Sequence, residues 1–282
     1  MTKIIAFSGK KQSGKTTATN FLFGIEMLSI QEPKLIDYFR INDAGKLIVP
    51  AKHDDEVVDS IFDPITPNES TIQFLATNIW PYIKQYNFAD VLKQRICIGL
   101  LGLSWNQCYG SDDDKNTETK YKWEDMPGVI TSKTLYSKIK TVDNVFYHEK
   151  GVMSARDIMQ YVGTKIFRKI YGDIWVEACI NHILSEQPEI AVIGDCRFPN
   201  EVKAIQDAGG VVVRLTRNRN SEDTDVSETA LDEYHYDWKN FNAIVDNENM
   251  TIKEQNMSVY NVLTELGVLN CSIETREGQY SK

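Results

Sequence analysis

Residues 9–16 read Gly-Lys-Lys-Gln-Ser-Gly-Lys-Thr and match the pattern G-x-x-x-x-G-K-[ST]. A β-rich apolar run at 3–8 precedes the pattern, and a stretch with apolar side chains at helical spacing follows it. A strand, a glycine-rich loop and a helix in this order form the phosphate-binding unit of α/β proteins. The motif therefore predicts a strand, a loop and a helix whose apolar face carries Phe21, Leu22, Ile25 and Leu28.

Each residue type in this loop has a chemical reason for its place. Gly9 and Gly14 let the backbone wrap closely around phosphate oxygens, which accept hydrogen bonds from loop N–H groups and from the helix amino terminus. Lys15 is placed to reach the β and γ phosphates, and the Thr16 hydroxyl to bind Mg²⁺. The predicted nucleotide-binding residues are Gly9, Lys11, Ser13, Gly14, Lys15, Thr16 and Thr17. The alternative is a glycine-rich turn that only caps a helix.

A second signal is a carboxylate at the end of an apolar run. Residues 189–194 predict a buried strand, and Asp195 and Arg197 follow it. In a parallel sheet the carboxyl ends of the strands face the ligand crevice, beside the glycine-rich loop if the two strands are neighbours. There Asp195 could hold Mg²⁺ through water or polarise the phosphate acceptor, and Arg197 could bind a phosphate with two donors. Alternatively, Asp195 only caps the helix that begins at Pro199.

The order of the predicted elements indicates the fold class. Strand and helix patterns alternate, which is typical of a three-layer α/β domain with a parallel sheet, here the P-loop NTPase fold with helical insertions and a lid. Further helices are predicted at 88–101, 154–170, 173–184, 199–208 and 252–266, and further strands at 189–194, 211–216 and 242–245. The chain, 1–282, is interpreted as one domain. It carries an inserted, partly loop segment near 31–86, expected to cover a site, and a polar excursion near 111–150.

Charge and composition exclude several kinds of partner. Acidic side chains outnumber basic ones by 40 to 31, giving a formal net charge of −9, so no direct binding to nucleic acid or to an anionic membrane is expected. No apolar run approaches the roughly 18 residues of a membrane-spanning helix, and the chain begins with a strand pattern rather than a leader. The five cysteines form no C-x-x-C pair. These features predict a soluble, cytoplasmic protein without a zinc site.

Five segments resemble, in their order and spacing, the bacteriophage deoxynucleoside monophosphate kinases. They are 88–93 (FADVLK), 103–110 (LSWNQCYG), 155–168 (ARDIMQYVGTKIFR), 173–176 (DIWV) and 195–210 (DCRFPNEVKAIQDAGG). With the loop at 9–16, the resemblance spans about two-thirds of the chain, and the combination of the segments is specific. The segment 31–86 has no counterpart in this resemblance.

The resemblance implies a P-loop kinase that transfers the γ-phosphate of ATP, with Mg²⁺, to a deoxynucleoside 5′-monophosphate for DNA precursor synthesis. It implies that the catalytic residues are Lys15, Asp195, Arg197 and Arg168, and that the metal ligands are Thr16 and Asp195. The residues implied to bind the acceptor are Phe88, Asp90, Lys93, Arg156, Arg168 and Arg197. The implied partners are small-molecule nucleotides in a cytoplasm, that of a host if the protein is viral, and a homodimer is left open.

The chain departs from the family pattern in two places. Many relatives have G-K-D-T where this chain has Gly14, Lys15, Thr16 and Thr17. With Thr16 in place of the aspartate, this chain has the hydroxyl that usually binds Mg²⁺ at this position. A histidine expected before the Ser-Glu pair at 227–228 is absent, so no catalytic role is assigned to the loop at 224–228.

Each candidate also has an alternative. Arg156 and Arg168 lie in predicted amphipathic helices, where surface ion pairs are the default, and Phe88 and Trp175 are of a kind more often found in cores. Three further arginines are either lid residues or part of a solvated turn: Arg214, Arg217 and Arg219. The alternatives for the whole protein are another small-molecule P-loop kinase, acting on a coenzyme precursor or a free nucleoside, and a non-catalytic ATP-binding regulatory protein.

Overall fold

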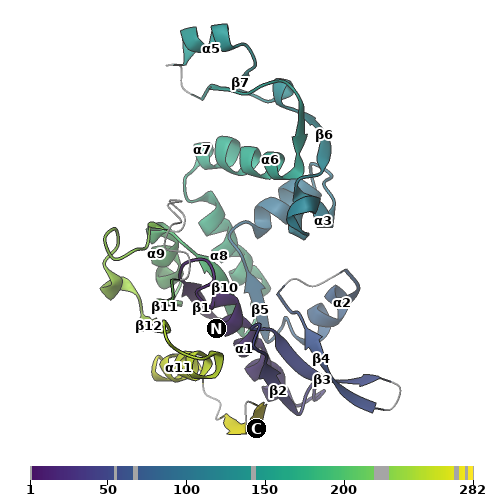
Figure 1. Cartoon of the computed structure of the whole chain (residues 1–282), viewed down its shortest axis with the longest axis vertical. Coiled ribbons are helices and arrows are strands. Elements are labelled where there is room, and N and C mark those ends of the chain that lie inside the picture. Colours follow the sequence, from purple (N-terminus) through teal and green to yellow (C-terminus); the bar gives the residue numbers. More distant parts are fainter. Residues whose placement is uncertain are drawn as a thin grey trace. The chain divides into compact units, whose positions relative to one another are not determined.

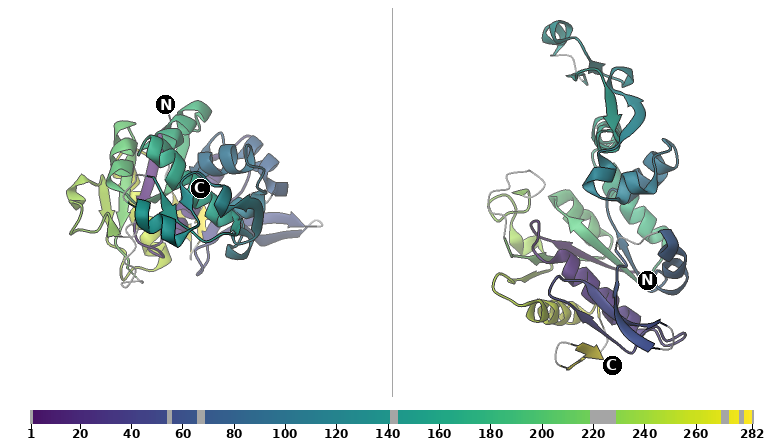
Figure 2. Two further views of the ribbon diagram at one scale, coloured as in Figure 1. Left: turned by 90° about the horizontal axis from the view of Figure 1, so that it is seen from above. Right: turned by 45° about the vertical axis from the view of Figure 1, so that its right-hand side comes forward.

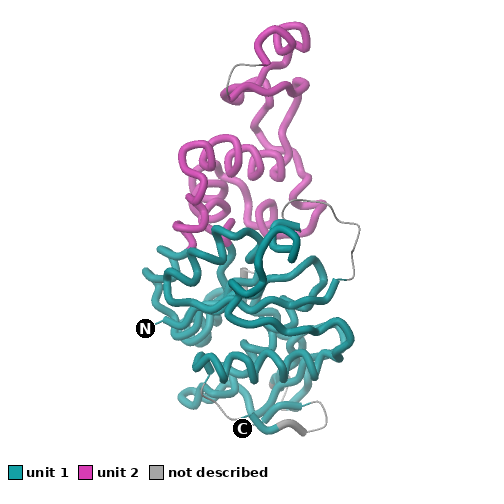
Figure 3. Tube along the Cα trace, turned by 90° about the vertical axis from the view of Figure 1, so that its left-hand side faces the viewer, with its two compact units in different colours: residues 1–87, 180–282 teal, residues 88–179 magenta. Residues whose placement is uncertain are grey.

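The computed structural model describes residues 2–53, 56–65, 69–140, 144–218, 229–269, 273–276 and 279–281. The chain divides into two compact units, which Figure 3 shows in different colours. The first unit comprises residues 1–87 and 180–282, and the second comprises residues 88–179. The second unit is therefore inserted in sequence between two segments of the first. The interpretation of the whole chain as one kinase domain stays a prediction.

The first unit is built on a five-stranded parallel sheet (Figure 1). In spatial order its strands are β12 (Ala243–Val245), β11 (Val211–Leu215), β1 (Lys3–Ser8), β10 (Ile190–Cys196) and β5 (Ile83–Tyr86). The central strand, β1, pairs in parallel with both β10 and β11. The predicted parallel sheet is confirmed. The strand before the glycine-rich loop and the strand that carries Asp195 are neighbours, as the site prediction requires.

Helices cover both faces of this sheet (Figures 1 and 2). On one face α1 (Lys15–Ser29) packs beside α11 (Ile252–Glu265). On the other face lies α9 (Pro199–Asp207), whose Ile205 borders Gly210 together with Ile4 of β1. The carboxyl half of α8 (Ile174–Glu186) lies on that face too, because its His182 ring packs edge-on against Tyr86 of β5 at 5.6 Å. The first unit therefore has three layers.

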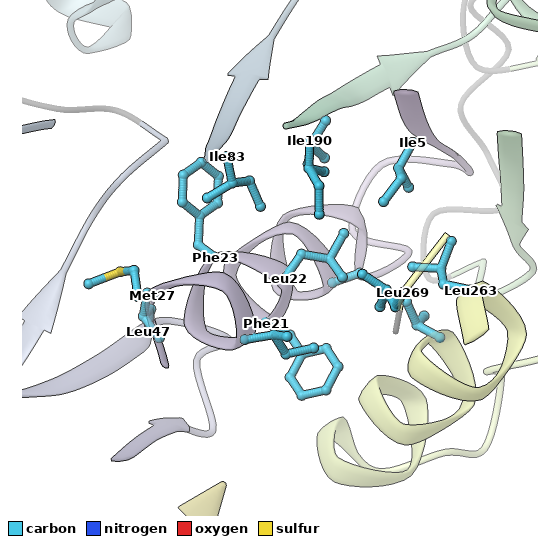
Figure 4. Packing of buried hydrophobic residues seen from close by; sticks show 14 of the residues in the cluster. Ile5, Phe21, Leu22, Phe23, Met27, Leu47, Ile83, Ile190, Leu263 and Leu269 are labelled. Carbon is cyan, nitrogen blue, oxygen red and sulfur yellow. The ribbon is translucent and has the colours of Figure 1, made fainter. Parts of the chain in front are cut away.

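The core of the first unit is centred on α1 (Figure 4). Phe21, Leu22 and Phe23 are successive residues of this helix, and all three are buried. A helix that is apolar nearly all round is stable only when other elements surround it. Here the parallel sheet supplies Ile5, Ile83 and Ile190, α11 supplies Leu263, and the segment after α11 supplies Leu269. The amino terminus of α1, which follows the glycine-rich loop, is thus fixed to a well-packed core.

The segment 31–86, predicted to be a partly loop insertion, contains more regular structure than its prolines suggested. It forms three strands, the helix α2 (Glu69–Asn78) and the edge strand β5 of the parallel sheet. The strands form a second, antiparallel sheet in the order β13 (Glu274–Arg276), β14 (Gln279–Ser281), β2 (Tyr38–Ile41), β3 (Leu47–His53) and β4 (Glu56–Phe62). The sequence did not predict this sheet, because Pro50 lies within β3, where proline is unusual, and because β14 comes from the far end of the sequence.

Aromatic packing joins the antiparallel sheet to α1. Phe39 of β2 and Tyr280 of β14 stack with ring centroids 4.9 Å apart, and Phe21 meets Tyr280 edge-on at 5.0 Å. Gly24 of α1 permits this approach, since a Cβ at this position would lie 2.3 Å from the Phe39 ring. The antiparallel sheet therefore belongs to the core of the first unit.

The second unit is largely helical. A π-helix, η1 (Leu92–Ile98), lies in the segment predicted as helical at 88–101. The predicted helix at 154–170 is confirmed as three consecutive segments, α6 (Ala155–Gln160), η3 (Tyr161–Phe167) and α7 (Arg168–Ile170). The region between them, including the polar excursion, contains the short elements α3 (Trp105–Tyr109), α4 (Asp112–Lys115), β6 (Glu118–Lys122), η2 (Trp123–Asp125), β7 (Val129–Ile130), α5 (Lys133–Ile139), β8 (Phe146–Tyr147) and β9 (Val152–Ser154). Across the described ranges, no helix is long and apolar enough to cross a membrane.

Candidate active site

The loop between β1 and α1 requires both glycines of its motif. A Cβ at Gly9 would lie 2.4 Å from the Ser13 hydroxyl, and one at Gly14 would lie 2.3 Å from the Gln255 side chain. Gly14 also has a φ of 102°, in the left-handed region that favours glycine. The loop follows the carboxyl end of the central strand and leads directly into α1. The predicted strand, loop and helix are confirmed.

The Lys15 side chain lies inside this loop. Its Nζ donates hydrogen bonds to the backbone carbonyls of Gly9 and Lys10, at 2.6 and 2.7 Å. The Ser13 side chain is fully buried, and its hydroxyl has no hydrogen-bond partner among the described residues. A buried hydroxyl in this state is unfavourable unless a ligand or a water completes it. An ammonium and a hydroxyl in these positions can serve the oxygens of a phosphate group.

Two buried amides that the sequence analysis did not identify hold the loop carbonyls. Asn247 Nδ2 donates to the carbonyl of Ser13 at 2.8 Å and to Oε1 of Gln255 at 2.7 Å. Gln255 Nε2 donates to the carbonyl of Gly14 at 3.2 Å. The only sequence signal for this contact is that Gln255, Val259 and Leu263 share one face of α11, which places an amide on a buried face. These two side chains fix the shape of the loop.

Arg217 is buried, so a solvated turn is wrong for this residue. Its guanidinium donates from Nε and Nη2 to the carbonyl of Asn247, at 3.1 and 2.8 Å, and from Nη2 to the carbonyl of Met250, at 2.6 Å. Its backbone N–H also donates to the Asn247 side chain at 2.8 Å. Arg217 is therefore tied to the same segment that supports the glycine-rich loop.

Arg214 is also buried, and a solvated turn is wrong for it as well. Its Nη1 donates to the hydroxyl of Ser8 at 3.0 Å, and its Nη2 lies 3.5 Å from the carboxylate of Asp232. Asp232 pairs at 3.0 Å with Lys10 of the loop. A chain of charged groups thus connects β11 to the glycine-rich loop. Arg219 and the loop at 224–228 lie outside the described residues.

Asp195 lies near the carboxyl end of β10, next to the end of β1. Ser8 of β1 pairs in register with Cys196, which places Asp195 at the same edge of the sheet as the loop. The carboxylate that caps α9 is that of Glu201, which accepts hydrogen bonds from the backbone N–H groups of Arg197 and Phe198, at 2.7 and 3.1 Å. Glu201 thus supplies a capping contact at α9, and the capping role considered for Asp195 stays an alternative. Burial, with the nearby Glu201 and Asp195 charges, raises the pKa of the Cys196 thiol well above its ordinary value.

A pocket of about 250 Å³ opens beside the glycine-rich loop. The loop side supplies a continuous series of residues to its lining: Gln12, Ser13, Gly14, Lys15, Thr16 and Thr17. The remaining walls come from residues 43–45, which connect β2 to β3, and from Arg217 and Ile252. All of these residues belong to the first unit.

Three of the predicted acceptor residues begin the second unit. Phe88 is buried, in keeping with the core alternative, and Asp90 is buried too. Asp90 Oδ1 accepts a hydrogen bond from the Tyr109 hydroxyl at 3.0 Å, and Lys93 Nζ lies 4.6 Å from the centre of the Tyr109 ring. Burial and the Asp90 charge raise the pKa of Tyr109, which keeps its hydroxyl protonated as a donor. The structure thus brings Asp90 and Lys93 together around Tyr109, a residue the sequence analysis did not select.

The predicted phosphate-binding arginines of the second unit differ in their surroundings. Arg156 donates to Asp112 at 2.6 Å and to Asn116 at 3.0 Å, which is the surface ion pair considered as its alternative. Arg168 is the first residue of α7, and its side chain is exposed. Trp175 is buried and donates from Nε1 to the carbonyl of Gly163 at 3.0 Å, as its core alternative expects. The binding of a nucleotide phosphate by Arg156 or Arg168 stays a prediction.

Two oxygens of the predicted metal site come from neighbouring elements. Thr16 is exposed in the first turn of α1, and Asp195 is half-buried on β10. Over the part of the chain that the structure describes, no group of three or more His, Cys, Asp or Glu residues could hold a metal ion.

The parallel sheet, its glycine-rich loop and the helices on both faces are the architecture of a kinase-like α/β protein. The family model of deoxynucleotide monophosphate kinases matches residues 82–257. This match covers more than half of the chain, so the protein belongs to that family, as the resemblance indicated. It is a phosphotransferase that phosphorylates deoxynucleoside monophosphates for DNA precursor synthesis. No individual curated protein matches the sequence.

The matched region has a definite relation to the structure. It runs from just before β5 into α11 and includes the whole second unit. The glycine-rich loop, α1 and the antiparallel sheet lie outside it. The family match therefore supports the reaction, whereas the donor site depends on the geometry of the loop itself.

Proposed function

We propose that the enzyme takes its phosphate from ATP bound on the loop at 9–16, which acts as a P-loop. The observation that supports this most directly is the Lys15 ammonium held inside the loop by the carbonyls of Gly9 and Lys10. Because phosphate oxygens carry charge, they are stronger acceptors for an ammonium than backbone carbonyls are. The ATP phosphates would bind to Lys15 and to the N–H groups at the start of α1.

Mg²⁺ fits the oxygens at this edge of the sheet. In phosphate-transfer sites the ion commonly keeps several waters and uses one or two protein oxygens together with the substrate phosphates. The Thr16 hydroxyl and the Asp195 carboxylate, from adjoining elements, would supply such a set. When bound, the ion neutralises charge on the phosphates.

We assign the remaining roles to arginines and to the start of the second unit. Arg197 and Arg168 would neutralise charge on the transferred group or hold the phosphate of the acceptor, for which the planar guanidinium is well shaped. Phe88, Asp90 and Lys93 would bind the acceptor nucleoside. Arg156 would have to exchange Asp112 for a phosphate to take part.

The transfer itself needs positioning more than covalent chemistry. An oxygen of the acceptor 5′-phosphate attacks the γ-phosphorus, one P–O bond forms, and the bond to the β-phosphate oxygen breaks to release ADP. Lys15 stabilises the negative charge that moves to the leaving oxygen. Asp195 and the arginines keep the reacting groups in line. Holding both substrates in this geometry removes the entropic cost of a bimolecular encounter.

A panel of acceptors tests this function. The enzyme is assayed with ATP and Mg²⁺ on thymidine, deoxycytidine, deoxyguanosine and deoxyadenosine monophosphates, beside their ribose and unphosphorylated counterparts. Deoxynucleoside monophosphates should give acceptor-dependent ADP, and free nucleosides should fail because an empty phosphate pocket leaves arginines unpaired. Efficient use of thymidine itself would discard this acceptor site, and equal use of ribonucleotides would discard the preference for deoxyribose.

We also place the enzyme in a cytoplasm. The four cysteines in the described ranges are buried and are not in disulfides, as expected in a reducing compartment. A homodimer and a bacteriophage source stay predictions.

A further inference from the structure

The pocket beside the glycine-rich loop has walls that the family match does not contain. Residues 43–45, which connect β2 to β3, line it together with residues of the glycine-rich loop. These residues lie well before residue 82, where the family match begins. The antiparallel sheet thus places a turn at the proposed donor site.

The turn at 42–46 is held in one conformation. The Asn42 side chain accepts hydrogen bonds from the backbone N–H groups of Ala44 and Lys46, at 3.0 and 2.9 Å. The Gly45 carbonyl accepts a hydrogen bond from the buried Asn20 side chain of α1 at 2.8 Å. A rigid turn that is hydrogen-bonded to α1 can position a side chain for a ligand.

Gly45 brings the turn unusually close to the start of α1. Its φ is 73°, and a Cβ at this position would lie 2.3 Å from the Thr17 hydroxyl oxygen. Thr17 follows the two residues, Lys15 and Thr16, that the motif assigns to the terminal phosphates and to Mg²⁺. The turn therefore adjoins the phosphate-binding residues without being one of them.

The turn presents the Asp43 carboxylate, a group that can accept hydrogen bonds from hydroxyls. Asp43 lines the pocket, its side chain is exposed, and it has no hydrogen-bond or ion-pair partner in the described part of the chain. A carboxylate only accepts hydrogen bonds at neutral pH, and it repels phosphates. In a nucleoside triphosphate, the groups that can donate hydrogen bonds to a carboxylate are the sugar hydroxyls and an amino group of the base.

We infer that the turn at 42–46 is the nucleoside subsite of the phosphate donor, and that Asp43 accepts hydrogen bonds from the sugar hydroxyls of ATP. This inference rests on the proposed function, because it takes the loop at 9–16 as the ATP site. The sugar is favoured over the base because it is the part of the nucleoside that is joined to the phosphates, and the turn adjoins the phosphate-binding residues at Thr17. Ile252 and Arg217 also line the pocket, where the base would lie.

The test measures ATP binding to the full chain by calorimetry, and KM and kcat for ATP at saturating acceptor. The variants are Asp43→Ala and Asp43→Asn, and the matched control is Asp37→Ala, which removes an exposed carboxylate that pairs with Lys34 and does not line the pocket. Asp43→Ala should weaken ATP binding about tenfold or more, with kcat nearly unchanged, because it removes a charged acceptor. Asp43→Asn should lose less, and Asp37→Ala should bind ATP as the unmodified enzyme does.

A second ligand identifies the group that Asp43 meets. The unmodified enzyme should bind 2′,3′-dideoxy-ATP more weakly than ATP, and Asp43→Ala should bind the two equally. If Asp43→Ala binds ATP normally, the subsite is wrong. If the unmodified enzyme binds 2′,3′-dideoxy-ATP as tightly as ATP, the sugar assignment is wrong.

Lys15→Ala separates this inference from the proposed function. Loss of ATP-dependent transfer in that variant, with normal ATP binding by Asp43→Ala, would overturn the subsite alone. Normal ATP binding and turnover by a folded Lys15→Ala protein would overturn the ATP site and the subsite with it.

Discussion

The side-chain amide of Asn247 donates a hydrogen bond to the backbone carbonyl of Ser13 at 2.8 Å, although the two residues are 234 positions apart in the sequence. Asn247 also accepts from the backbone of Arg217 and donates to Gln255. A single buried amide thus joins the proposed donor loop to two other segments of the first unit. Its loss should affect both the stability of the fold and the shape of the loop.

Asn247→Ala should destabilise the protein by about 1–3 kcal/mol, because it leaves buried backbone and side-chain groups without their partners. It should also raise KM for ATP, since the Ser13 carbonyl is no longer held. Urea unfolding and ATP kinetics on the same preparation measure both effects. Asn249→Ala is the control, because Asn249 is exposed in the same connection. Equal stability of the two variants would contradict the role given to Asn247.

Lys15→Ala should leave the fold intact and lower turnover by at least about a hundredfold, because its charge is aimed at oxygens that gain negative charge during transfer. Circular dichroism checks the fold, and a coupled ADP assay measures the rate. Lys3→Ala, at the opposite end of β1, is the matched control and should keep normal turnover. Near-normal turnover in a folded Lys15→Ala protein would refute the assignment of the loop.

Asp195→Asn and Glu201→Gln should separate catalysis from capping. Asp195→Asn should cut turnover and weaken the dependence on Mg²⁺, with little change in melting temperature. Glu201→Gln should cost about 1 kcal/mol of stability, because Glu201 accepts from the backbone N–H groups of Arg197 and Phe198 just before α9. Thermal melting and rates at several Mg²⁺ concentrations test the pair. A stability loss without a rate loss in Asp195→Asn would return that residue to a structural role.

Stability at acid pH should depend on Glu186. Burial tends to raise the pKa of this carboxyl, but hydrogen bonds from Lys84 and Tyr86 outweigh it and hold the pKa below its ordinary value of 4.5. A carboxyl with a lowered folded-state pKa stabilises the fold above its unfolded-state pKa, and the contribution is lost as the pH falls through the folded-state pKa. The free energy of unfolding should therefore fall below about pH 4.5, and Glu186→Gln should flatten this dependence. Urea unfolding at pH 3 to 7 tests it, and Glu265→Gln, exposed on α11, should behave as the unmodified protein does.

The sequence predicted the parts of the site whose structure is local. The glycines at 9 and 14 are required by the loop itself, so their pattern identified the loop and its two flanking elements. The strand at 189–194 was recognisable from its apolar residues, whereas its place beside β1 was only a condition of the site prediction, which the structure meets.

Groups whose role depends on distant partners could not be predicted in this way. Asn247 and Gln255 act on carbonyls at the other end of the chain. The position of Gln255 on the apolar face of α11 indicates its burial but not its partner, and Asn247 has no such local pattern. The burial of Arg214 depends on Ser8 and Asp232, which are distant in sequence. The antiparallel sheet was missed for a similar reason, because β14 completes it from beyond residue 278.

The central position of β1 affects how the chain can fold during synthesis. Lys3 pairs with Ile190 and Ile5 with Val211, so the first strand has no partners in the parallel sheet until the ribosome has made the whole second unit and most of the first. Contacts of such long sequence separation form slowly, and an unpaired apolar strand is prone to aggregate until its partner strands have been synthesised. Recovery of soluble enzyme should therefore be sensitive to growth temperature and to chaperones during expression, even if the finished protein is stable.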